Sequence, residues 1–249
     1  MQITITGISN IAEVQPGDDL PGLILSGCRA SGVDLQAGDI LVIAQKIVSK
    51  AEGQVVDLRE VEPSPFAKQY AEKWGKDPRQ IEVVLRESKR VVRMDKGVLI
   101  TETRHGFVCA NAGVDASNVP GEHMVTLLPV DSDASAARIR AVVKDRAGVD
   151  VPVIISDSFG RTWRNGIINI AIGVSGLMPL NDLRGQKDQH GYLMHATVIA
   201  IADELASAAE LAMGKLAACP AAVIRGYNYE PAEGTAQELV MDPARDMFR

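Results

Sequence analysis

The sequence predicts a mixed α+β fold, with all 249 residues (1–249) in a single domain. Strand-like and helix-like segments alternate irregularly along the chain, and no proline- or glycine-rich linker separates one half from the other. The glycines match neither the GxGxxG pattern after a strand nor GxxxxGK followed by serine or threonine. We therefore expect neither a Rossmann fold nor a P-loop.

The N-terminal quarter is expected to hold two strands and two helices. Polar and apolar residues alternate over residues 1–8, which is the pattern of a half-buried strand. Residues 16–32 predict a turn and a short helix, and residues 37–53 predict a turn and a buried strand. Residues 64–75 begin with Ser-Pro and end in glycine, which are signals for the start and the end of a helix.

The middle of the chain predicts a helix, a strand and a hairpin. Residues 78–94 are expected to continue as a helix and then as a strand. Residues 97–118 predict a hairpin with its turn at His105 and Gly106, followed by a glycine-containing loop.

The second half is expected to alternate helices and buried strands. Residues 133–147 predict a helix with Asp133 as its N-cap, and the apolar run 151–155 predicts a buried strand. Residues 220–226 predict another apolar strand. Residues 197–213 predict a helix whose buried face carries the apolar residues at 198, 201, 205, 208 and 212.

Composition and charge narrow the functional class. Apolar residues make up 46% and charged residues 23% of the chain, as in ordinary globular proteins. A formal net charge of −6 argues against a nucleic-acid or anionic-membrane surface. The 3 cysteines form no CxxC pair, and no apolar run approaches the roughly 20 residues of a membrane span. Without a secretory signal either, we expect a cytoplasmic protein.

Two acidic residues follow apolar stretches and predict a metal site. Asp115 lies in ANAGVDASN, and Asp157 and Ser158 follow the strand-like run in VPVIISDSFGRTWRNG. Mg²⁺ and Mn²⁺ prefer oxygen ligands, so these residues would form a site if the two loops converge. The alternative is that each aspartate is only an N-cap or the first residue of an Asx-turn.

Cations near these acids predict binding of an anion such as polyphosphate. Arg161 and Arg164 closely follow Asp157, and guanidinium groups match phosphate geometry. Lys46 and Lys50 follow the apolar run DILVIA and could reach phosphates as point charges. The alternatives to anion binding are that the arginines form surface ion pairs and that the lysines are simply solvated.

The polar loop 180–194 is too long for a simple turn, which is typical of functional loops. Its residue His190 and the following His195 lack HExxH spacing, so metal binding by them is not expected. From the residues alone, the chain is a protein with a divalent-metal and phosphate site, and neither the nucleotide nor the acceptor is specified.

The sequence resembles the coenzyme F420-0:L-glutamate ligase (F420:γ-glutamyl ligase) family in segments that span residues 8–226. Each segment alone is weak, but together they occur in the order of the family. The stand-alone form is expected, without the additional C-terminal flavin-reductase-like domain of some members. The matching segments are GDILVIAQKIVSKAEG, VCANAGVDASNV, LLPVDSDASA, VIISDSFGRTWRNG, AIGVSGL, DLRGQKDQHGYL, ADELASAAELAMGK and AAVIRG.

The resemblance implies a two-lobed mixed α+β ligase fold that forms a homodimer, and a GTP-dependent synthesis of amide bonds in coenzyme F420 biosynthesis. The lactyl carboxylate of F420-0, a deazaflavin, would be activated by the γ-phosphate of GTP as an acyl phosphate. L-Glutamate would attack it, with GDP and phosphate as products, and a second glutamate would join through a γ-glutamyl link. The number of glutamates, the exact three-carbon acid and a requirement for K⁺ stay open.

The resemblance also implies residue roles. Asp115 and Asp157 match ligands of a first Mg²⁺ or Mn²⁺ ion, and Ser158 matches a ligand of a second. Asp157, Arg161 and Arg164 are expected to be catalytic. The expected nucleotide-binding residues are Ile11, Ala12, Glu13, Val14, Gln45, Lys46, Lys50, Asn118, Met213, Gly214 and Lys215.

One position departs from the family. Family members can carry a carboxylate where this chain has Lys215. Either a second metal ion is held by fewer protein ligands, or Lys215 contacts a phosphate directly.

Two alternative functions stay open beside the ligase. One is a non-catalytic protein that binds a nucleotide or a deazaflavin, although pure binding needs fewer metal ligands than this chain retains. The other is an amide ligase for a different carboxylate acceptor, with the loop 180–194 as the expected determinant of that choice.

Overall fold

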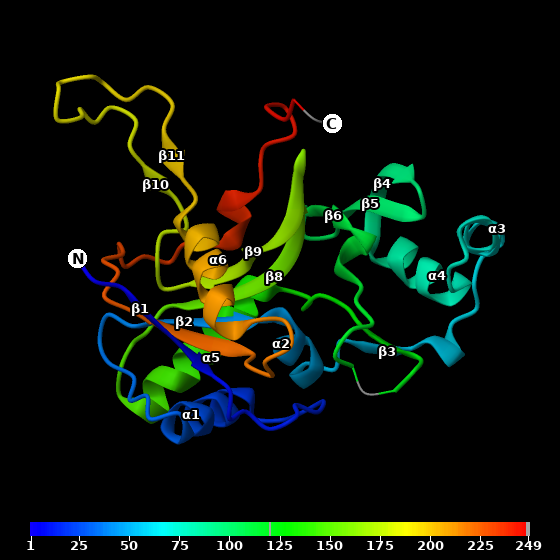
Figure 1. Cartoon of the computed structure of the whole chain (residues 1–249), viewed down its shortest axis with the longest axis horizontal. Coiled ribbons are helices and arrows are strands. Elements are labelled where there is room, and N and C mark those ends of the chain that lie inside the picture. Colours follow the sequence, from blue (N-terminus) through cyan, green and yellow to red (C-terminus); the bar gives the residue numbers. More distant parts are fainter. Residues whose placement is uncertain (120, 248–249) are drawn as a thin grey trace.

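The computed structural model describes residues 1–119 and 121–247, which form a larger lobe and a smaller lobe (Figure 1). Among these residues, the larger lobe contains a five-stranded sheet in the order β1-β12-β2-β8-β9. The smaller lobe is inserted in the chain between β2 and β8. This mixed arrangement of helices and sheets confirms the predicted fold class.

The larger lobe supplies the framework of the molecule. Strands β2 and β8 are parallel, whereas the other neighbours in the sheet are antiparallel. The elements of this lobe are β1 (Thr4–Ile8), α1 (Leu20–Ala30), β2 (Ile40–Ala44), α2 (Gln45–Ala51), α5 (Ser132–Ala147), β8 (Val153–Arg161), β9 (Arg164–Ser175), α6 (Ile201–Met213), β12 (Ala221–Arg225) and the 3₁₀ turn η3 (Ala236–Leu239).

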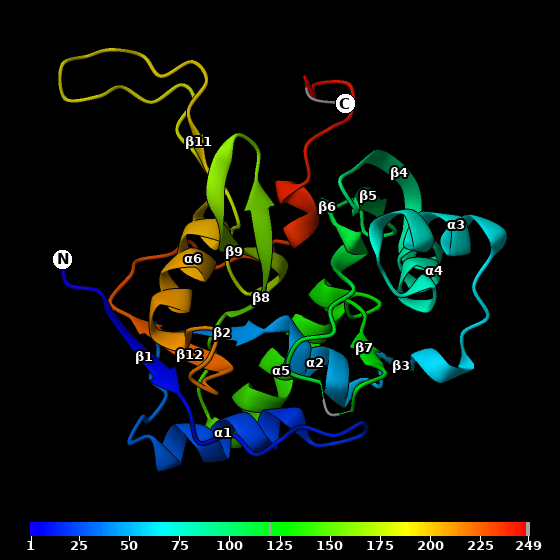
Figure 2. The same ribbon diagram turned by 45° about the vertical axis from the view of Figure 1, so that its right-hand side comes forward.

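Helices cover both faces of this sheet, as Figure 2 shows. One face packs on α1 and α5 through residues such as Ile24 and Ile139, and the other packs on α6 through residues such as Leu205. Helix α5 approaches β9 closely at Gly173, where a Cβ atom would lie 2.4 Å from the Ser132 carbonyl oxygen. Glycine is therefore required at this crossing.

The smaller lobe has its own core. Helices α3 and α4 pack with Leu99 of the sheet β4-β5-β6 and with Val125 of the pair β3-β7. Strands β3 and β7 are the entry to and the exit from the lobe, and they pair with each other. The elements are β3 (Val55–Asp57), η1 (Leu58–Glu60), α3 (Pro65–Trp74), α4 (Pro78–Glu87), β4 (Ser88–Asp95), β5 (Val98–Thr103), β6 (Val108–Ala110), η2 (Asn111–Gly113) and β7 (Met124–Thr126).

Several predicted elements are confirmed with their boundaries. Helix α3 begins after Ser64, whose side chain accepts a hydrogen bond from the Ala67 amide, and it ends at Gly75 in the left-handed conformation. The helix–strand order of residues 78–94 is confirmed by α4 and β4. The hairpin turn at His105 and Gly106 lies between β5 and β6, as predicted.

The predicted cap of α5 was wrong by two residues. The helix begins at Ser132, and its N-cap is Asp131, whose side chain accepts from the Ala134 amide. Asp133 instead turns inward and accepts hydrogen bonds from the amides of Val174 (2.7 Å) and Ala236 (2.8 Å). It therefore ties β9 and the C-terminal segment to the helix.

The buried face of α6 was predicted only in part. The helix begins at Ile201, so position 198 lies before it, in β11 (Val198–Ile199). Positions 201 and 205 are buried as expected, but 208 and 212 are only partly covered. The fully buried small residues are Ala202, Ala206 and Ala209, because alanine lets the helix lie close to the sheet.

The structure corrects two strand predictions, shortening one and extending the other. Residues 45–51, expected as the end of a strand segment, form the helix α2. Strand β8 does not end at the acidic residues but continues through Asp157 and Ser158 to Arg161, paired with β9. The two residues were expected in a loop, because the apolar run stops there.

Residues 183–197 project from the larger lobe as an arm (Figure 1, yellow). The arm is closed at its base by β10 (Asn181–Asp182) and β11, which pair with each other. None of the helices in the two described ranges is long and apolar enough to cross a membrane.

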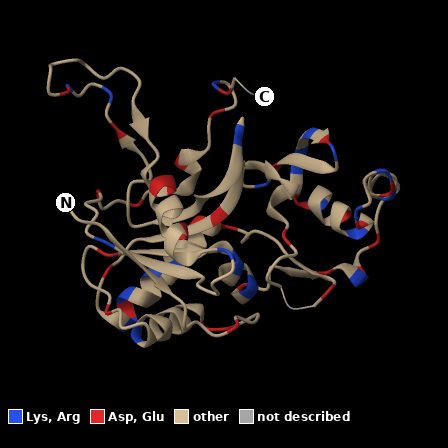
Figure 3. Ribbon diagram, viewed as in Figure 1, with Lys and Arg blue, Asp and Glu red and all other residues tan. Residues whose placement is uncertain are grey.

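Acidic and basic residues are interspersed on both lobes, as Figure 3 shows. Charges of both signs lie on the helices of the smaller lobe and on α5 of the larger lobe. Mixing of this kind is typical of the solvated surface of a globular protein.

The contrast between Asp131 and Asp133 gives a stability prediction. Asp133→Ala should lower the free energy of unfolding by about 2–4 kcal/mol, because two buried amides lose a charged acceptor. Asp131→Ala should lower it by about 1 kcal/mol, the usual effect of losing an N-cap.

Urea denaturation would measure both changes. Asp145→Ala, at an exposed position of the same helix, is the matched control and should stay within about 0.5 kcal/mol of the wild type. Equal losses for Asp131→Ala and Asp133→Ala would contradict the different roles assigned to them.

Candidate active site

A cavity of about 320 Å³ lies where β2 ends and β8 continues. The last pair in the ladder between the two strands is Ala44 and Ser156. Beyond this pair the chain of β2 turns into α2, so Asp157 and Ser158 have no neighbour from β2 and line the cavity. A bulge in the β8–β9 ladder lies next to Ser156.

The cavity brings together most of the predicted site from distant parts of the chain. Its walls come from the segment after β1, from α2, from β8 and β9, and from the end of α6 with the loop that follows. The predicted residues that line it are Ile11, Ala12, Glu13, Val14, Gln45, Lys46, Lys50, Asn118, Asp157, Ser158, Met213, Gly214 and Lys215. Their shared location agrees with a single binding site, and their individual roles stay predictions.

Asp115 joins this site through Lys46. The Lys46 ammonium lies 2.8 Å from Asp115 Oδ2 and also contacts the Ser117 hydroxyl. Asp115 Oδ1 accepts from the Ser117 amide at 2.7 Å, which is an Asx-turn. Asp115 therefore forms the Asx-turn of the alternative interpretation, and its role as a metal ligand stays a prediction.

The pKa of Asp115 lies below its ordinary value. Burial alone would raise this pKa, but hydrogen bonds from Lys46 and Ser117 and the charge of Lys46 outweigh it. The carboxylate is thus ionised at neutral pH and able to act as a ligand.

Asp157 has the opposite shift. Burial raises the pKa of its carboxyl group to about 6, and the charge of Asp115 adds to this rise. The Ser158 amide and the ammonium groups of Lys215 and Lys46 act against it. Because desolvation and the charge of Asp115 both disfavour ionised Asp157, a cation bound at this pair of carboxylates would favour its charged form.

Ser158 lies in a chain of hydrogen bonds. Its Oγ accepts from Lys215 Nζ at 2.6 Å and lies 2.6 Å from Asn169 Oδ1, to which it donates. Asn169 Nδ2 donates to Glu210 Oε2 at 2.8 Å. The neighbouring strand and α6 therefore fix the orientation of Ser158.

Lys50 and two unpaired acceptors complete the walls. Lys50 is buried, and its Nζ lies 2.6 Å from Glu13 Oε1. Within the described residues, Gln45 Oε1 and Ser156 Oγ are buried at the cavity without a hydrogen-bond partner. A buried unsatisfied polar atom costs about 1–3 kcal/mol, so a ligand that bonds these atoms would be favoured.

Arg161 and Arg164 are not among the residues that line the cavity. They flank the tight turn of the β8–β9 hairpin, where Arg161 Nη2 donates to the Asn165 carbonyl at 2.6 Å. Their catalytic role stays a prediction.

Sequence reasoning missed Asn169 and Glu210. Neither residue was singled out from the sequence: Asn169 lies within IINIAIG and Glu210 within the predicted helix of residues 197–213. Asn169 is 5% exposed. A single amide inside an otherwise apolar strand is the signal that could have identified Asn169, because a buried amide needs partners.

The donor set fits one divalent ion. Mg²⁺ and Mn²⁺ sites in proteins use one or two carboxylates and leave other positions to water and substrate phosphate. Asp115 and Asp157 supply that number, and their charges interact. No group of three or more His, Cys, Asp or Glu residues suited to a metal ion occurs within residues 1–119 and 121–247.

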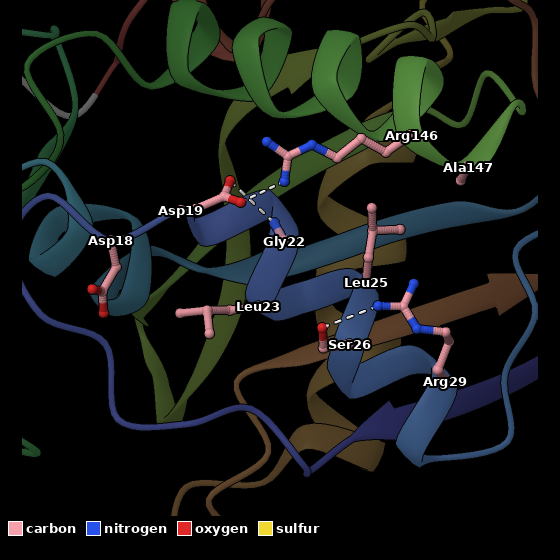
Figure 4. Close-up of a pocket in the computed structure, with 9 residues that line it drawn as sticks. All are labelled: Asp18, Asp19, Gly22, Leu23, Leu25, Ser26, Arg29, Arg146 and Ala147. Carbon is pink, nitrogen blue, oxygen red and sulfur yellow. Dashed lines mark hydrogen bonds and ion pairs between the residues drawn. The ribbon is translucent and has the colours of Figure 1, made fainter.

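A second hollow, of about 460 Å³, lies between α1 and the end of α5 (Figure 4). Asp19 pairs there with Arg146, and Arg29 donates to Ser26 Oγ at 3.1 Å. Its lining shares no residue with the cavity that holds the predicted site. Its polar groups are engaged with one another, so we assign the site to the cavity beside β8.

The raised pKa of Asp157 predicts that this residue lowers stability at neutral pH. A carboxyl group whose pKa is raised on folding is penalised as the pH rises through about 4 to about 6, and the penalty is full above that range. Asp157→Asn should therefore stabilise the ligand-free protein by about 1–3 kcal/mol at pH 8 and by much less at pH 4.

Urea denaturation in EDTA at both pH values would measure this difference. The exposed Asp145→Asn is the control and should show no such pH dependence. If Asp157→Asn proves less stable than the wild type at pH 8, the account of Asp157 is contradicted.

Comparisons with known proteins place the chain in a family. The family model for F420-0:gamma-glutamyl ligase matches residues 9–226. The coenzyme F420:L-glutamate ligase of Methanothermobacter thermautotrophicus is 44% identical over 252 residues, covering 100% of both chains. That of Methanopyrus kandleri is 48% identical over 242 residues, covering 95% of this chain and 94% of its own. The chain belongs to the F420-0:gamma-glutamyl ligase family, a family of ligase enzymes.

Proposed function

We propose that the chain joins L-glutamate to the lactyl carboxylate of coenzyme F420-0 at the expense of GTP, with Mg²⁺ or Mn²⁺. Family membership and relatives named coenzyme F420:L-glutamate ligase support the substrates. The single observation that carries the proposal is the cavity itself. It gathers the expected nucleotide residues, Asp157 and three lysines around one space, and Asp115 is joined to it through Lys46.

The proposed reaction has two steps. First, a carboxylate oxygen of the acceptor attacks the γ-phosphorus of GTP, the bond to the β-phosphate oxygen breaks, and GDP and an acyl phosphate form. The amine of L-glutamate then attacks the acyl carbon, phosphate leaves, and the nitrogen loses a proton. A second round through the side-chain carboxylate of the first glutamate gives the γ-glutamyl link.

The residues of the cavity suit this chemistry. Phosphoryl transfer depends mainly on positioning and on neutralising negative charge. Lys46, Lys50 and Lys215 bring ammonium groups to the cavity, and Asp115 and Asp157 would hold the divalent ion. When bound, that ion neutralises phosphate charge. The unpaired Gln45 Oε1 would accept a hydrogen bond from the nucleotide.

Homodimer formation is part of the proposal, and the arm supports it. Tyr192 is 62% exposed and Leu193 is 39% exposed on this projecting loop. At the tip of the β8–β9 hairpin, Trp163 is 84% exposed. Apolar side chains on projecting segments are typical of surfaces that another chain covers. A second copy would also bring its own arginines near such a surface.

A non-catalytic binding protein and a ligase for another acceptor are the remaining candidates. The first is disfavoured because Asp157, Ser158 and the lysines line one cavity and Asp115 is paired with Lys46 at its edge, more than pure binding needs. The second shares the same chemistry and differs only in the acceptor. Because the reaction consumes GTP and glutamate, we place it in the cytoplasm.

The reaction itself can be observed directly. Purified protein incubated with lactyl-phospho-deazaflavin, L-glutamate, GTP and Mn²⁺ should yield products one and two glutamate residues heavier, as measured by mass spectrometry. Samples with ATP in place of GTP, and with EDTA, should give little product. A product that carries no added glutamate would refute the proposed reaction. The absence of any product while GTP and the acceptor are bound would refute it as well.

Asp157→Asn separates the ligase from the binding protein. The variant should lose at least about 100-fold in turnover, because a carboxylate that holds the divalent ion is removed. Binding of GTP without metal should change little, as isothermal titration calorimetry would measure. Normal turnover in this variant would rule out the role assigned to Asp157.

The dimer prediction concerns the arm. The wild-type chain should sediment with twice its 26.7 kDa mass. Replacing residues 184–196 by a short glycine–serine linker should yield monomers, because the exposed apolar side chains of the arm are lost.

Analytical ultracentrifugation at several concentrations would measure both. Met241→Ser, an exposed apolar position outside the arm, is the control and should leave the dimer intact. A monomeric wild type would refute the dimer, and a dimer without the arm would refute the assigned surface.

A further inference from the structure

Lys215 lies where the chain leaves α6. The helix ends at Met213, and Gly214 adopts φ 61° and ψ 155°, which turns the chain toward the cavity. From the rim of the cavity, Lys215 donates from Nζ to Ser158 Oγ at 2.6 Å. Ser158 is the residue at which the family resemblance implied a second metal ion.

The hydrogen-bond chain beyond Ser158 has a fixed direction. An ammonium group only donates and a carboxylate only accepts, so protons must point from Lys215 toward Glu210. The hydroxyl proton of Ser158 is thereby committed to Asn169 Oδ1. Its oxygen faces the ammonium group, and Asn169 is itself buried. These hydrogen bonds hold the positively charged ammonium group of Lys215 next to Ser158.

Lys215 differs from the other lysines of the cavity in its charge balance. Lys46 is paired with Asp115, and Lys50 is paired with Glu13, each within 2.8 Å. Within residues 1–119 and 121–247, Lys215 forms no ion pair, and its hydrogen-bond partner is the neutral hydroxyl of Ser158. Its charge therefore acts on Asp157 without a direct ionic contact, and the ammonium group stays available to a ligand.

A second divalent ion does not fit beside this group. Within the described residues, Ser158 Oγ is held by Lys215 and Asn169, and the Asn169 amide is held by Glu210, so these side chains are already engaged in hydrogen bonds. A metal ion at Ser158 would also lie next to the Lys215 ammonium, where like charges repel. The position that could carry a carboxylate in the family thus carries a cation here.

We propose that the Lys215 ammonium replaces the second divalent ion. It binds a phosphate oxygen of the ligand beside Ser158, and the chain binds one divalent ion instead of two. The inference rests on the proposed function only in taking a phosphate-bearing ligand for this cavity. An ammonium group binds phosphate as a point charge, which suits a group whose charge has no other partner.

The test counts metal ions. Equilibrium dialysis with Mn²⁺ and saturating pyrophosphate should give one Mn²⁺ per wild-type chain and two for Lys215→Glu, which supplies a carboxylate at this place. Lys215→Met should weaken pyrophosphate binding at saturating Mn²⁺ by roughly 10- to 100-fold. Lys76→Glu, the same charge change on an exposed residue of the smaller lobe, is the control and should match the wild type.

Three results would overturn the inference. They are two bound Mn²⁺ ions per wild-type chain, only one bound Mn²⁺ ion per chain of Lys215→Glu, and an unchanged affinity of Lys215→Met for pyrophosphate. The substitutions are at an exposed position, and circular dichroism would verify their folding. If GTP fails to bind while pyrophosphate binding still depends on Lys215, the proposed nucleotide is wrong and this inference is supported. The two proposals are therefore tested separately.

Discussion

The site depends on a mismatch in length between two parallel strands. β2 stops at Ala44, whereas β8 continues beyond Ser156 with only β9 as its partner. Polar side chains can follow an apolar strand here because they no longer face a neighbouring strand. The same end of β2 directs α2 along the cavity, so that Lys46 and Lys50, one helical turn apart, both line it. The mismatch therefore creates the cavity and determines what lines it.

Charges in the cavity are arranged at a cost to stability. The buried Asp157 carboxyl has its pKa raised to about 6, although two ammonium groups act in the other direction. Gln45 Oε1 and Ser156 Oγ are buried without partners in the described part of the chain. Each of these features disfavours the ligand-free fold, and a charged polar ligand would relieve them. Destabilising features of this kind, a desolvated carboxyl group and unpaired buried polar atoms, are expected at functional sites and not in a structural core.

Local signals predicted most elements, whereas the site required long-range information. Ser-Pro and glycine defined α3 because capping is decided within a few residues, but Asp131 and Asp133 are equally good caps in sequence. Which of them turns inward depends on the distant amides of Val174 and Ala236. Asn169 was missed for the same reason, since its partners lie on β8 and α6. Periodicity cannot show contacts between residues so far apart in the chain.

The hydrogen bonds that link Lys215, Ser158, Asn169 and Glu210 explain why the role of Lys215 cannot be inferred from that position alone. If Glu210 were replaced by an apolar residue, Asn169 would lose the acceptor that fixes its amide, and its oxygen would no longer be directed at Ser158. The Ser158 proton could then point toward Lys215 and weaken the contact with the ammonium group. The location of the positive charge is thus set by a carboxylate on α6, two hydrogen bonds beyond Ser158. A lysine beside Ser158 is consistent with the fold because the donors and acceptors from Lys215 to Glu210 accommodate it.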